Sequence, residues 1–285
     1  MTAPGRTASE VGARTKVLAL LGDPVEHSLS PVIQNAAFRT EALDGVYVAL
    51  RCGPDEVGGL VRGIARAGGG GNVTLPHKGR CAEAVEVPTE AVSRTGACNT
   101  FWLEDGRVHG DNTDVEGFRR ALHTLLGRSA EGARVLLVGA GGAARAVLLG
   151  LLDEGVGEVT IANRTIERAR ELAAMIDPSR VTVSEAGMPR GAGFDVVVNA
   201  TRLGLNADDP LPVDLGGMGE GEAVMDLVYG PSRTPLVREA ASLGIRAADG
   251  GEMLVQQGAV AFERWWGRPA PVEAMRTALA AARMG

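Results

Sequence analysis

The chain has 285 residues, of which 45% are apolar and 22% charged, a balance typical of a globular protein with buried cores. At about 100–200 residues per domain, this length predicts two domains. The formal net charge of −6 and the lack of any basic run argue against a nucleic-acid partner, which requires a clustered positive field.

Cysteine use and hydropathy indicate the compartment. The three cysteines are far apart and form no Cys-x-x-Cys pair, so the sequence predicts neither a disulfide framework nor a metal site. The opening stretch Met1–Lys16 lacks the apolar run of a signal peptide, and no later segment reaches the roughly 18 apolar residues of a membrane span. We therefore expect a polar N-terminal tail, no membrane contact and a cytoplasmic location.

The first part of the chain alternates strand and helix patterns, which favours a mostly parallel sheet. The predicted strands are Thr15–Leu21, Val46–Leu50 and Asn72–Leu75, and the predicted helices are Pro31–Thr40 and Glu56–Ala67. Ser30 is the expected N-cap of the first helix, with Pro31 at its first position.

A second and clearer α/β series begins near Val115 and predicts a doubly wound sheet. Its predicted strands are Arg134–Val138, Glu158–Ala162, Val181–Val183, Asp195–Asn199, Ala223–Leu227 and Ile245–Ala247, with helices over Gly117–Leu126, Ala143–Glu154 and Thr165–Met175. Two amphipathic helices, Met253–Trp266 and Pro271–Met284, are expected to return to the first domain. The predicted domains are therefore 1–114 with 252–285, and 115–251.

A glycine-rich turn follows the strand Arg134–Val138. The segment Gly139-Ala-Gly-Gly-Ala-Ala144 matches the G-x-G-x-x-G/A pattern of dinucleotide-binding turns. Gly139 permits the tight turn, Gly141 lets the backbone approach a pyrophosphate, and Ala144 allows close packing of helix on strand. The alternative is a glycine-rich turn without a ligand.

The next strand ends in Asn163-Arg164-Thr165 instead of the acid that holds the ribose 2′-hydroxyl of NAD. Arg164 can stack on adenine or pair with a 2′-phosphate, and Arg168 adds a second positive charge one helical turn later. This pattern favours NADP. The alternative is that both arginines are ordinary solvated residues at a helix start.

Two polar motifs predict catalytic residues near strand ends. Lys78 follows the strand that Pro76 stops, and Asp114 ends the segment Gly110-Asp-Asn-Thr-Asp114. A ketone reduced by hydride requires a proton, and a lysine near a carboxylate can supply it. The alternative is an ordinary surface lysine.

Several motifs in order along the chain resemble the shikimate dehydrogenase family, with the resemblance extending from Val17 to Gly267. The motifs are Ser28-Leu-Ser-Pro31, Asn72-Val-Thr-Leu-Pro-His-Lys78, Gly96-Ala-Cys-Asn-Thr100, Asn112-Thr-Asp114, Asn199-Ala-Thr-Arg-Leu-Gly204, Asp226-Leu-Val-Tyr229 and Gly251-Glu-Met-Leu-Val-Gln-Gln257. Three positions depart from the family pattern: His77 replaces a frequent aromatic residue, Cys98 replaces valine and Leu205 replaces methionine.

The resemblance implies an N-terminal substrate-binding domain and a Rossmann-type NADP-binding domain. It implies a catalytic dyad of Lys78 and Asp114, with Asp114 also accepting from a substrate hydroxyl. The implied substrate contacts are Ser28, Ser30, Thr74, Asn99, Tyr229 and Gln257. The implied cofactor contacts are Gly139, Ala140, Gly141, Gly142, Ala143, Asn163, Arg164, Thr165, Arg168, Thr201, Leu227, Gly250, Gly251 and Met253. Plain capping of the following helix is the alternative role of the two serines.

The activity that the resemblance implies is the reversible NADPH-dependent reduction of 3-dehydroshikimate to shikimate, a step of aromatic amino acid biosynthesis. The partners would be small molecules alone, and the chain would be a monomer or a homodimer. One alternative is a related dehydrogenase that acts on quinate or an amino-substituted ring, often with NAD. Another is a non-catalytic regulator that senses NADP.

Overall fold

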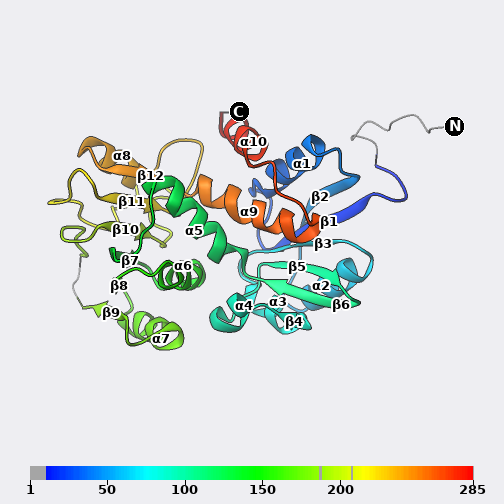
Figure 1. The fold of residues 1–285 in the computed structure, drawn as a ribbon, viewed down its shortest axis with the longest axis horizontal. Helices are drawn as coiled ribbons and strands as arrows, with labels where there is room; N and C mark the ends of the chain where they lie inside the picture. The colour runs from blue at the N-terminus through cyan, green and yellow to red at the C-terminus, as the bar shows by residue number, and fades with distance from the viewer. Residues whose placement is uncertain (1–10, 186–187, 207, 285) are drawn as a thin grey trace. The chain divides into compact units, whose positions relative to one another are not determined.

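The computed structural model describes residues 11–185, 188–206 and 208–284, so the tail expected at the N-terminus lies partly outside the described residues. The chain forms two compact units (Figure 1). Unit 1 comprises Met1–Thr113 and Gln257–Gly285, and unit 2 comprises Asp114–Gln256. The chain passes between the units in helix α5 (Thr113–Leu126) and again in helix α9 (Gly251–Trp266).

Unit 1 contains a six-stranded sheet in the order β2-β1-β3-β5-β6-β4. Its strands are β1 (Lys16–Gly22), β2 (Gly45–Arg51), β3 (Gly70–Val73), β4 (Val87–Pro88), β5 (Thr100–Glu104) and β6 (Arg107–Asp111). β1 is parallel to β2 and β3, and β4 is parallel to β6, whereas β5 is antiparallel to β3 and β6. Therefore β1, β3 and β6 end, and β5 begins, at one edge of the sheet, which we call the unit 1 edge.

Helices cover both faces of this sheet. They are α1 (Ser30–Thr40), α2 (Val57–Arg66), α3 (Lys78–Ala84), α4 (Glu90–Thr95), α10 (Val272–Met284) and the later part of α9. One core joins Leu21 and Phe101 of the sheet to Val61 of α2. A second set of contacts is aromatic: the ring of Phe38 in α1 lies 6.0 Å from that of Phe262 in α9, and α10 packs on α1.

Unit 2 contains six parallel strands in the order β12-β11-β10-β7-β8-β9. The strands are β7 (Arg134–Val138), β8 (Glu158–Ala162), β9 (Val181–Ser184), β10 (Val196–Asn199), β11 (Ala223–Asp226) and β12 (Arg246–Ala248). Counted within the unit, the order from β9 is 3-2-1-4-5-6, the order of dinucleotide-binding folds. The predicted α/β class with a doubly wound second sheet is confirmed.

Successive side chains of the buried strands of unit 2 point to opposite faces of the sheet, so an apolar core lies on each face. Leu137 and Val198 pack with α5, α6 (Gly142–Asp153) and α7 (Ile166–Ile176). Leu136 and Val197 face the other way and pack with α8 (Pro235–Ser242). We call the carboxyl ends of these strands the unit 2 edge, and ligands of such sheets bind there, beside the point where the strand order reverses.

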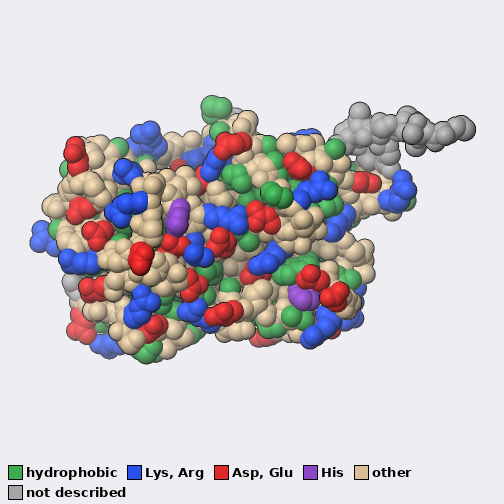
Figure 2. Space-filling view, in the orientation of Figure 1, with side chains coloured by type: hydrophobic (Ala, Val, Ile, Leu, Met, Phe, Trp, Pro, Cys, Tyr) green, Lys and Arg blue, Asp and Glu red, His purple; other side chains and the backbone are tan. Residues whose placement is uncertain are grey.

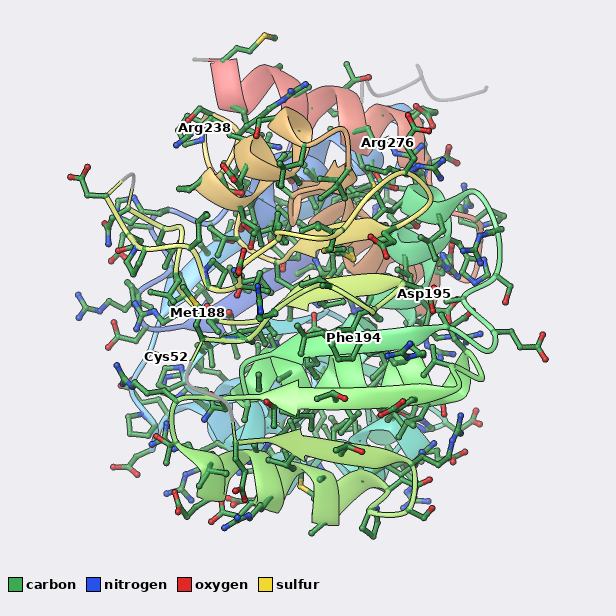
Figure 3. The ribbon with its side chains drawn as sticks, turned by 90° about the vertical axis from the view of Figure 1, so that its left-hand side faces the viewer. Cys52, Met188, Phe194, Asp195, Arg238 and Arg276 are labelled. Atoms are coloured by element: carbon green, nitrogen blue, oxygen red, sulfur yellow. The ribbon has the colours of Figure 1, made fainter. Side chains whose placement is uncertain are left out.

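The opposite edge of the unit 2 sheet is closed by contacts between its own loops. Phe194 and Asp195 lie directly before β10 (Figure 3). The backbone N–H of Arg134 donates to the Asp195 carboxylate at 2.7 Å, and the guanidinium of Arg134 lies 5.7 Å from the centre of the Phe194 ring. These contacts fix the strand starts, and the loops at the carboxyl ends remain the candidate binding edge.

Some elements differ from the sequence expectations. The hairpin of β5 and β6 and the short helices α3, α4 and α8 were not predicted. β3 covers Gly70–Val73 instead of Asn72–Leu75, because the strand begins in a glycine run that gives no strand signal and ends ahead of Pro76. The strands Arg134–Val138 and Glu158–Ala162 match their predictions at both ends.

Surface charge is mixed in sign. Acidic and basic side chains alternate over the face drawn in Figure 2 and form no extended patch of one sign there. In the part of the chain that the structure describes, none of the helices has both the length and the apolar character needed to span a membrane.

Candidate active site

The segments that carry candidate substrate residues in unit 1 leave its sheet at the unit 1 edge. β5 begins beside the end of β3, since Thr100 pairs with Asn72. The backbone continues this arrangement past the strands, because the Thr74 N–H donates to the Leu21 carbonyl at 2.8 Å. The loops after β1 and β3 and before β5 are therefore neighbours.

The two candidate serines lie at the start of α1. Ser30 is the first helical residue and is buried, while the N-cap is Leu29. The prediction that Ser30 is the N-cap is therefore wrong. The helix begins one residue earlier because the first turn tolerates Pro31, whose missing N–H needs no partner there. The Ser28 hydroxyl accepts from the Ser30 N–H at 3.3 Å, so Ser28 supports the helix start instead.

Lys78 is the first residue of α3, and the loop before it follows β3. His77 is the N-cap, is buried, and places its Nε2 2.9 Å from the carbonyl oxygen of Cys52, which Figure 3 labels. Because a carbonyl only accepts, Nε2 carries the proton. The Lys78 carbonyl in turn accepts from the Cys98 N–H at 3.0 Å. This hydrogen bond connects the start of α3, directly before Lys78, to the loop after β2. A hydrocarbon ring at position 77 would not make it.

Lysine is rare in this chain. Of its 29 lysines and arginines, Lys16 and Lys78 are the two lysines, so 27 are arginine. Lys16 has a structural role, since its Nζ donates to the Trp265 carbonyl at 3.1 Å and lies 4.7 Å from the centre of the Trp266 ring. Arginine holds its proton throughout the working pH range, whereas lysine can release one. Lysine at position 78 of an arginine-rich chain is a signal that the motif-based reasoning missed.

A buried polar network orients Asn99 at the unit 1 edge. Its Oδ1 accepts from the Thr113 N–H at 2.8 Å and from the Thr100 hydroxyl at 3.0 Å. Asn72 donates to the Thr100 hydroxyl at 2.9 Å and accepts from the Tyr47 hydroxyl at 2.7 Å. A backbone N–H only donates, so the amide oxygen of Asn99 must face Thr113. Sequence reasoning found Asn99 but missed the partners that orient it, whose signal is polar residues within apolar strands.

The loop after β6 leads to Asp114. Asp111, the last residue of β6, is buried, pairs with Arg264 at 3.0 Å and accepts from the Asn112 N–H at 2.8 Å. Asn112 donates to the Thr95 hydroxyl at 3.0 Å. Asp114 is the second residue of α5 and is 9% exposed. Asp111 and Asn112, which lead to this helix, are therefore held by defined bonds.

The remaining candidate substrate residues belong to different units. Gln257 lies within α9, at the first position of the C-terminal segment of unit 1. Tyr229 lies in unit 2, three residues after the end of β11. Both side chains are partly exposed.

In unit 2, β7 leads through a glycine turn into α6. Gly139 has a φ of +112°, which residues with side chains rarely adopt. Gly141 is the N-cap of α6, and a Cβ added there would meet no atom within 4 Å. Ala140 lies between them, and Gly142 and Ala143 begin the helix, whose first N–H groups have no partner within it. Open space beside a positive helix end fits the phosphates of a dinucleotide.

The loop after β8 is basic. The Asn163 side chain donates to the Thr165 carbonyl at 2.7 Å and shapes the turn. Arg164 and Arg168 are exposed, and among the residues that the structure describes neither side chain has a hydrogen-bond or ion-pair partner. Two unpaired guanidinium groups beside a dinucleotide turn fit an additional phosphate.

Three further loops contribute to the unit 2 edge. Thr201 follows β10, Leu227 follows β11, and Gly250 and Gly251 lead into α9. A Cβ on Gly250 would lie 2.2 Å from the Leu227 carbonyl oxygen, so this approach requires glycine. Met253 is 8% exposed and packs into the apolar core of unit 2. The described residues include no group of three or more His, Cys, Asp or Glu side chains that could hold a metal ion.

Comparison with known proteins extends this picture to the family level. Residues 20–101 match the shikimate dehydrogenase substrate binding domain, residues 121–204 match shikimate / quinate 5-dehydrogenase, and residues 250–280 match the shikimate 5′-dehydrogenase C-terminal domain. A shikimate dehydrogenase (NADP(+)) of Methanopyrus kandleri is 43% identical, with 94% of this chain and 96% of that protein covered.

Solved structures agree. A shikimate dehydrogenase crystallised with NADP+ is 36% identical and has a TM-score of 0.89, with 99% of this chain and all of that chain covered. A quinate dehydrogenase of Corynebacterium glutamicum crystallised with NAD is 29% identical and has a TM-score of 0.85, with 94% of this chain and 99% of that chain covered. The fold and its two edges define a two-domain α/β dehydrogenase. Within that class, the chain belongs to the shikimate dehydrogenase family.

Proposed function

We propose that this chain catalyses the reversible NADP-dependent conversion of shikimate to 3-dehydroshikimate, as part of aromatic amino acid biosynthesis. The observation that carries the cofactor choice is the pair Arg164, in the loop after β8, and Arg168, in the first turn of α7. Both are exposed and have no side-chain partner among the described residues, and the loop has no acid for a ribose hydroxyl. The Methanopyrus kandleri relative, whose name includes NADP(+), supports the same choice.

Unit 2 is proposed to bind the cofactor. The N–H groups at the start of α6 would hold the pyrophosphate, with Gly139, Ala140 and Gly141 forming the turn and Gly142 and Ala143 beginning the helix. The loop after β8 and the first turn of α7 would hold the adenine end through Asn163, Arg164, Thr165 and Arg168. The loops with Thr201, Leu227, Gly250, Gly251 and Met253 would border the nicotinamide end. When bound, NADP supplies the hydride acceptor, and NADPH the donor.

Unit 1 is proposed to bind the ring acid. Ser28 and Ser30 would donate hydrogen bonds to its carboxylate, because hydroxyls are donors that suit this group. Asn99 and Thr74 would bind ring hydroxyls, with Gln257 and, from unit 2, Tyr229 as further contacts. The fixed orientation of the Asn99 amide supports this role, since a preorganised group costs little ordering on binding.

Proton transfer is assigned to Lys78. In the reductive direction its ammonium group stabilises the alkoxide forming at the ring ketone and passes it a proton. In the oxidative direction the neutral amine takes the hydroxyl proton. Asp114 is assigned as the carboxylate that keeps this amine oriented and accepts from a neighbouring substrate hydroxyl.

The nearest alternative is a quinate or amino-substituted ring dehydrogenase of the same fold. The similarity to a quinate dehydrogenase crystallised with NAD supports this alternative, whereas Ser30 and Arg164 favour shikimate as the substrate and NADP as the cofactor. A non-catalytic NADP-sensing regulator is disfavoured because both Lys78 and Asp114 are present. The proposal includes a cytoplasmic location, small molecules as partners and a monomeric or homodimeric state.

Initial rates of absorbance change at 340 nm test the proposal, with shikimate and quinate each combined with NADP and NAD. The proposal predicts that the shikimate and NADP pair gives the highest rate. A dominant rate with quinate or NAD would move the protein to the alternative dehydrogenase. Four zero rates together with NADP binding would support the regulator.

A further inference from the structure

A buried carboxylate lies beneath the loops proposed for the nicotinamide end of the cofactor. Asp226 is the last residue of β11 and is fully buried. Three donors surround it: Asn199 Nδ2 at 2.8 Å, the Val228 N–H at 3.1 Å and the Thr234 hydroxyl at 2.6 Å. The resemblance to the family drew attention to Tyr229 of this motif and left Asp226 without a role.

The first donor controls the loop after β10. Asn199 gives one N–H to Asp226, and its Oδ1 accepts from the Thr201 N–H at 3.0 Å and from the Thr201 hydroxyl at 2.7 Å. Asn199 Nδ2 also lies 3.1 Å from the Leu203 carbonyl oxygen. The shape of the segment 199–203, which contains the candidate cofactor residue Thr201, therefore depends on an amide that Asp226 holds.

The other donors control the loop after β11. Val228 lies between the candidate residues Leu227 and Tyr229, and its carbonyl accepts from the Gly250 N–H at 3.0 Å. Thr234 is the N-cap of α8, and its hydroxyl also accepts from the Val237 N–H at 3.3 Å. One carboxylate thus joins the loop after β10, the loop after β11 and the start of α8.

A charge in this position is costly for folding. Burial raises the pKa of Asp226 against the opposing effect of its three hydrogen bonds, and the nearby charge of Asp249 raises it further. A raised folded-state pKa means that folding favours the neutral acid, so this group's contribution to stability is present at low pH and is lost as pH rises through the folded pKa.

We propose that Asp226 is a positioning residue that holds the Thr201 and Leu227 loops in the shape needed to bind the nicotinamide half of the cofactor. This inference rests on the proposed use of NADP. Asp226 itself is fully buried, so it would act through these loops and not through direct contact with the cofactor. The adenine half is assigned to Arg164 and Arg168, and among the described residues the hydrogen-bond partners of Asp226 are Asn199, Val228 and Thr234 instead.

The two halves can be tested separately by isothermal titration calorimetry. NADP probes both halves, whereas adenosine 2′,5′-bisphosphate probes the adenine half alone. For Asp226→Ala, which removes the acceptor from three donors, the dissociation constant for NADP is expected to rise about ten-fold while that for the bisphosphate stays within about two-fold. Asp226→Asn can keep these connections by donating to Thr234. This variant is expected to bind both ligands within about three-fold of wild type. Its free energy of unfolding at pH 7 is expected to equal or exceed that of wild type.

Each other outcome is decisive. Unchanged NADP affinity in Asp226→Ala, or equal weakening of both ligands, would overturn the positioning role. If Asp226→Ala fails to fold, Thr234→Val, with Thr234→Ser as its control, replaces it, and unchanged NADP affinity in Thr234→Val overturns the inference. Lack of NADP binding by the wild-type chain would overturn the proposed function and this inference together. If the wild-type chain binds NADP or the bisphosphate, the variants test the positioning role separately from the proposed function.

Discussion

Arg164 in the loop after β8, Arg168 in α7 and Arg170 in α7 all carry exposed guanidinium groups, but they differ in their partners. Arg170 pairs with Glu185 at 2.6 Å, whereas neither of the other two has a side-chain partner among the described residues. An unpaired arginine breaks no ion pair within the protein when it binds a phosphate, so charge-assisted bonds to a 2′-phosphate would not be offset by the loss of such a pair. In the proposed function, the choice between NADP and NAD therefore depends on these two side chains.

Replacing Arg164 tests that choice. In Arg164→Ala, KM for NADP is expected to rise about 10-fold to 100-fold, from the loss of a charge-assisted hydrogen bond, with KM for NAD unchanged. Steady-state kinetics with both cofactors measure the difference. Arg170→Ala is the matched control and should leave both KM values as in wild type. An equal rise for NAD and NADP in Arg164→Ala would contradict the phosphate role.

At the level of elements, loop geometry at the unit 2 edge depends on close backbone contact. Gly250 precedes α9, and a Cβ there would lie 2.2 Å from the carbonyl oxygen and 2.7 Å from the carbonyl carbon of Leu227. Both atoms belong to the backbone of a neighbouring loop, so neither can rotate away. The loop after β11 and the start of α9 are thus held in close contact with each other.

Gly250→Ala should therefore separate these two segments. The free energy of unfolding, measured by urea denaturation, is expected to fall by about 1–3 kcal/mol from overpacking. Gly230→Ala, in the loop after β11 that contains Leu227 but with no close contact at its Cβ, is expected to stay within about 0.5 kcal/mol of wild type. Equal stability of the two variants would show that the loops can separate without cost.

The elements differed in how well the sequence predicted them. The strand Arg134–Val138 is a buried apolar run after its first residue, and Glu158–Ala162 is rich in β-branched residues, both of which are strong local signals. The hairpin of β5 and β6 was missed because Trp102, Glu104 and His109 give it a mixed pattern, and its stability comes from pairing with β3.

The candidate site shows the same limit. Motifs identified Asn99 and Lys78, because sequence order carries those patterns. The partners that orient them, Tyr47 for the Asn99 network and Cys52 for His77, come from β2 and the loop after it. Contacts between distant segments depend on the tertiary fold, so local sequence does not predict them.

At the level of the whole molecule, unit 2 is tied together by an ion-pair network between α5 and the end of α6. The carboxylate of Glu154 is buried and lies 2.6 Å from Arg119 Nε and 2.5 Å from His123 Nε2. Burial alone raises the pKa of Glu154, but the hydrogen bonds from His123 and Arg119 outweigh it and hold the pKa below its usual value. The ionised form is therefore the one that folding favours.

This network predicts a pH-dependent stability difference. A lowered folded-state pKa contributes stability above the unfolded value of about 4.3, and that stability is lost as pH falls through the folded value. Glu154→Gln is expected to lower the free energy of unfolding by about 1–3 kcal/mol at pH 7, with the difference shrinking below about pH 4. Urea denaturation from pH 3 to pH 7 measures it. A difference that is constant over this range would contradict the account.

The measurement that tests the whole account most directly is kcat for Lys78→Ala at saturating shikimate and NADP, beside dissociation constants for both ligands. Loss of the proton-transferring group should lower kcat by about 10²-fold to 10⁴-fold while both ligands bind within about two-fold of wild type. Lys16→Arg, at the other lysine of the chain, is the control and should keep its kcat. A wild-type kcat in Lys78→Ala, with binding intact, would remove this lysine from the chemistry and contradict the proposed mechanism.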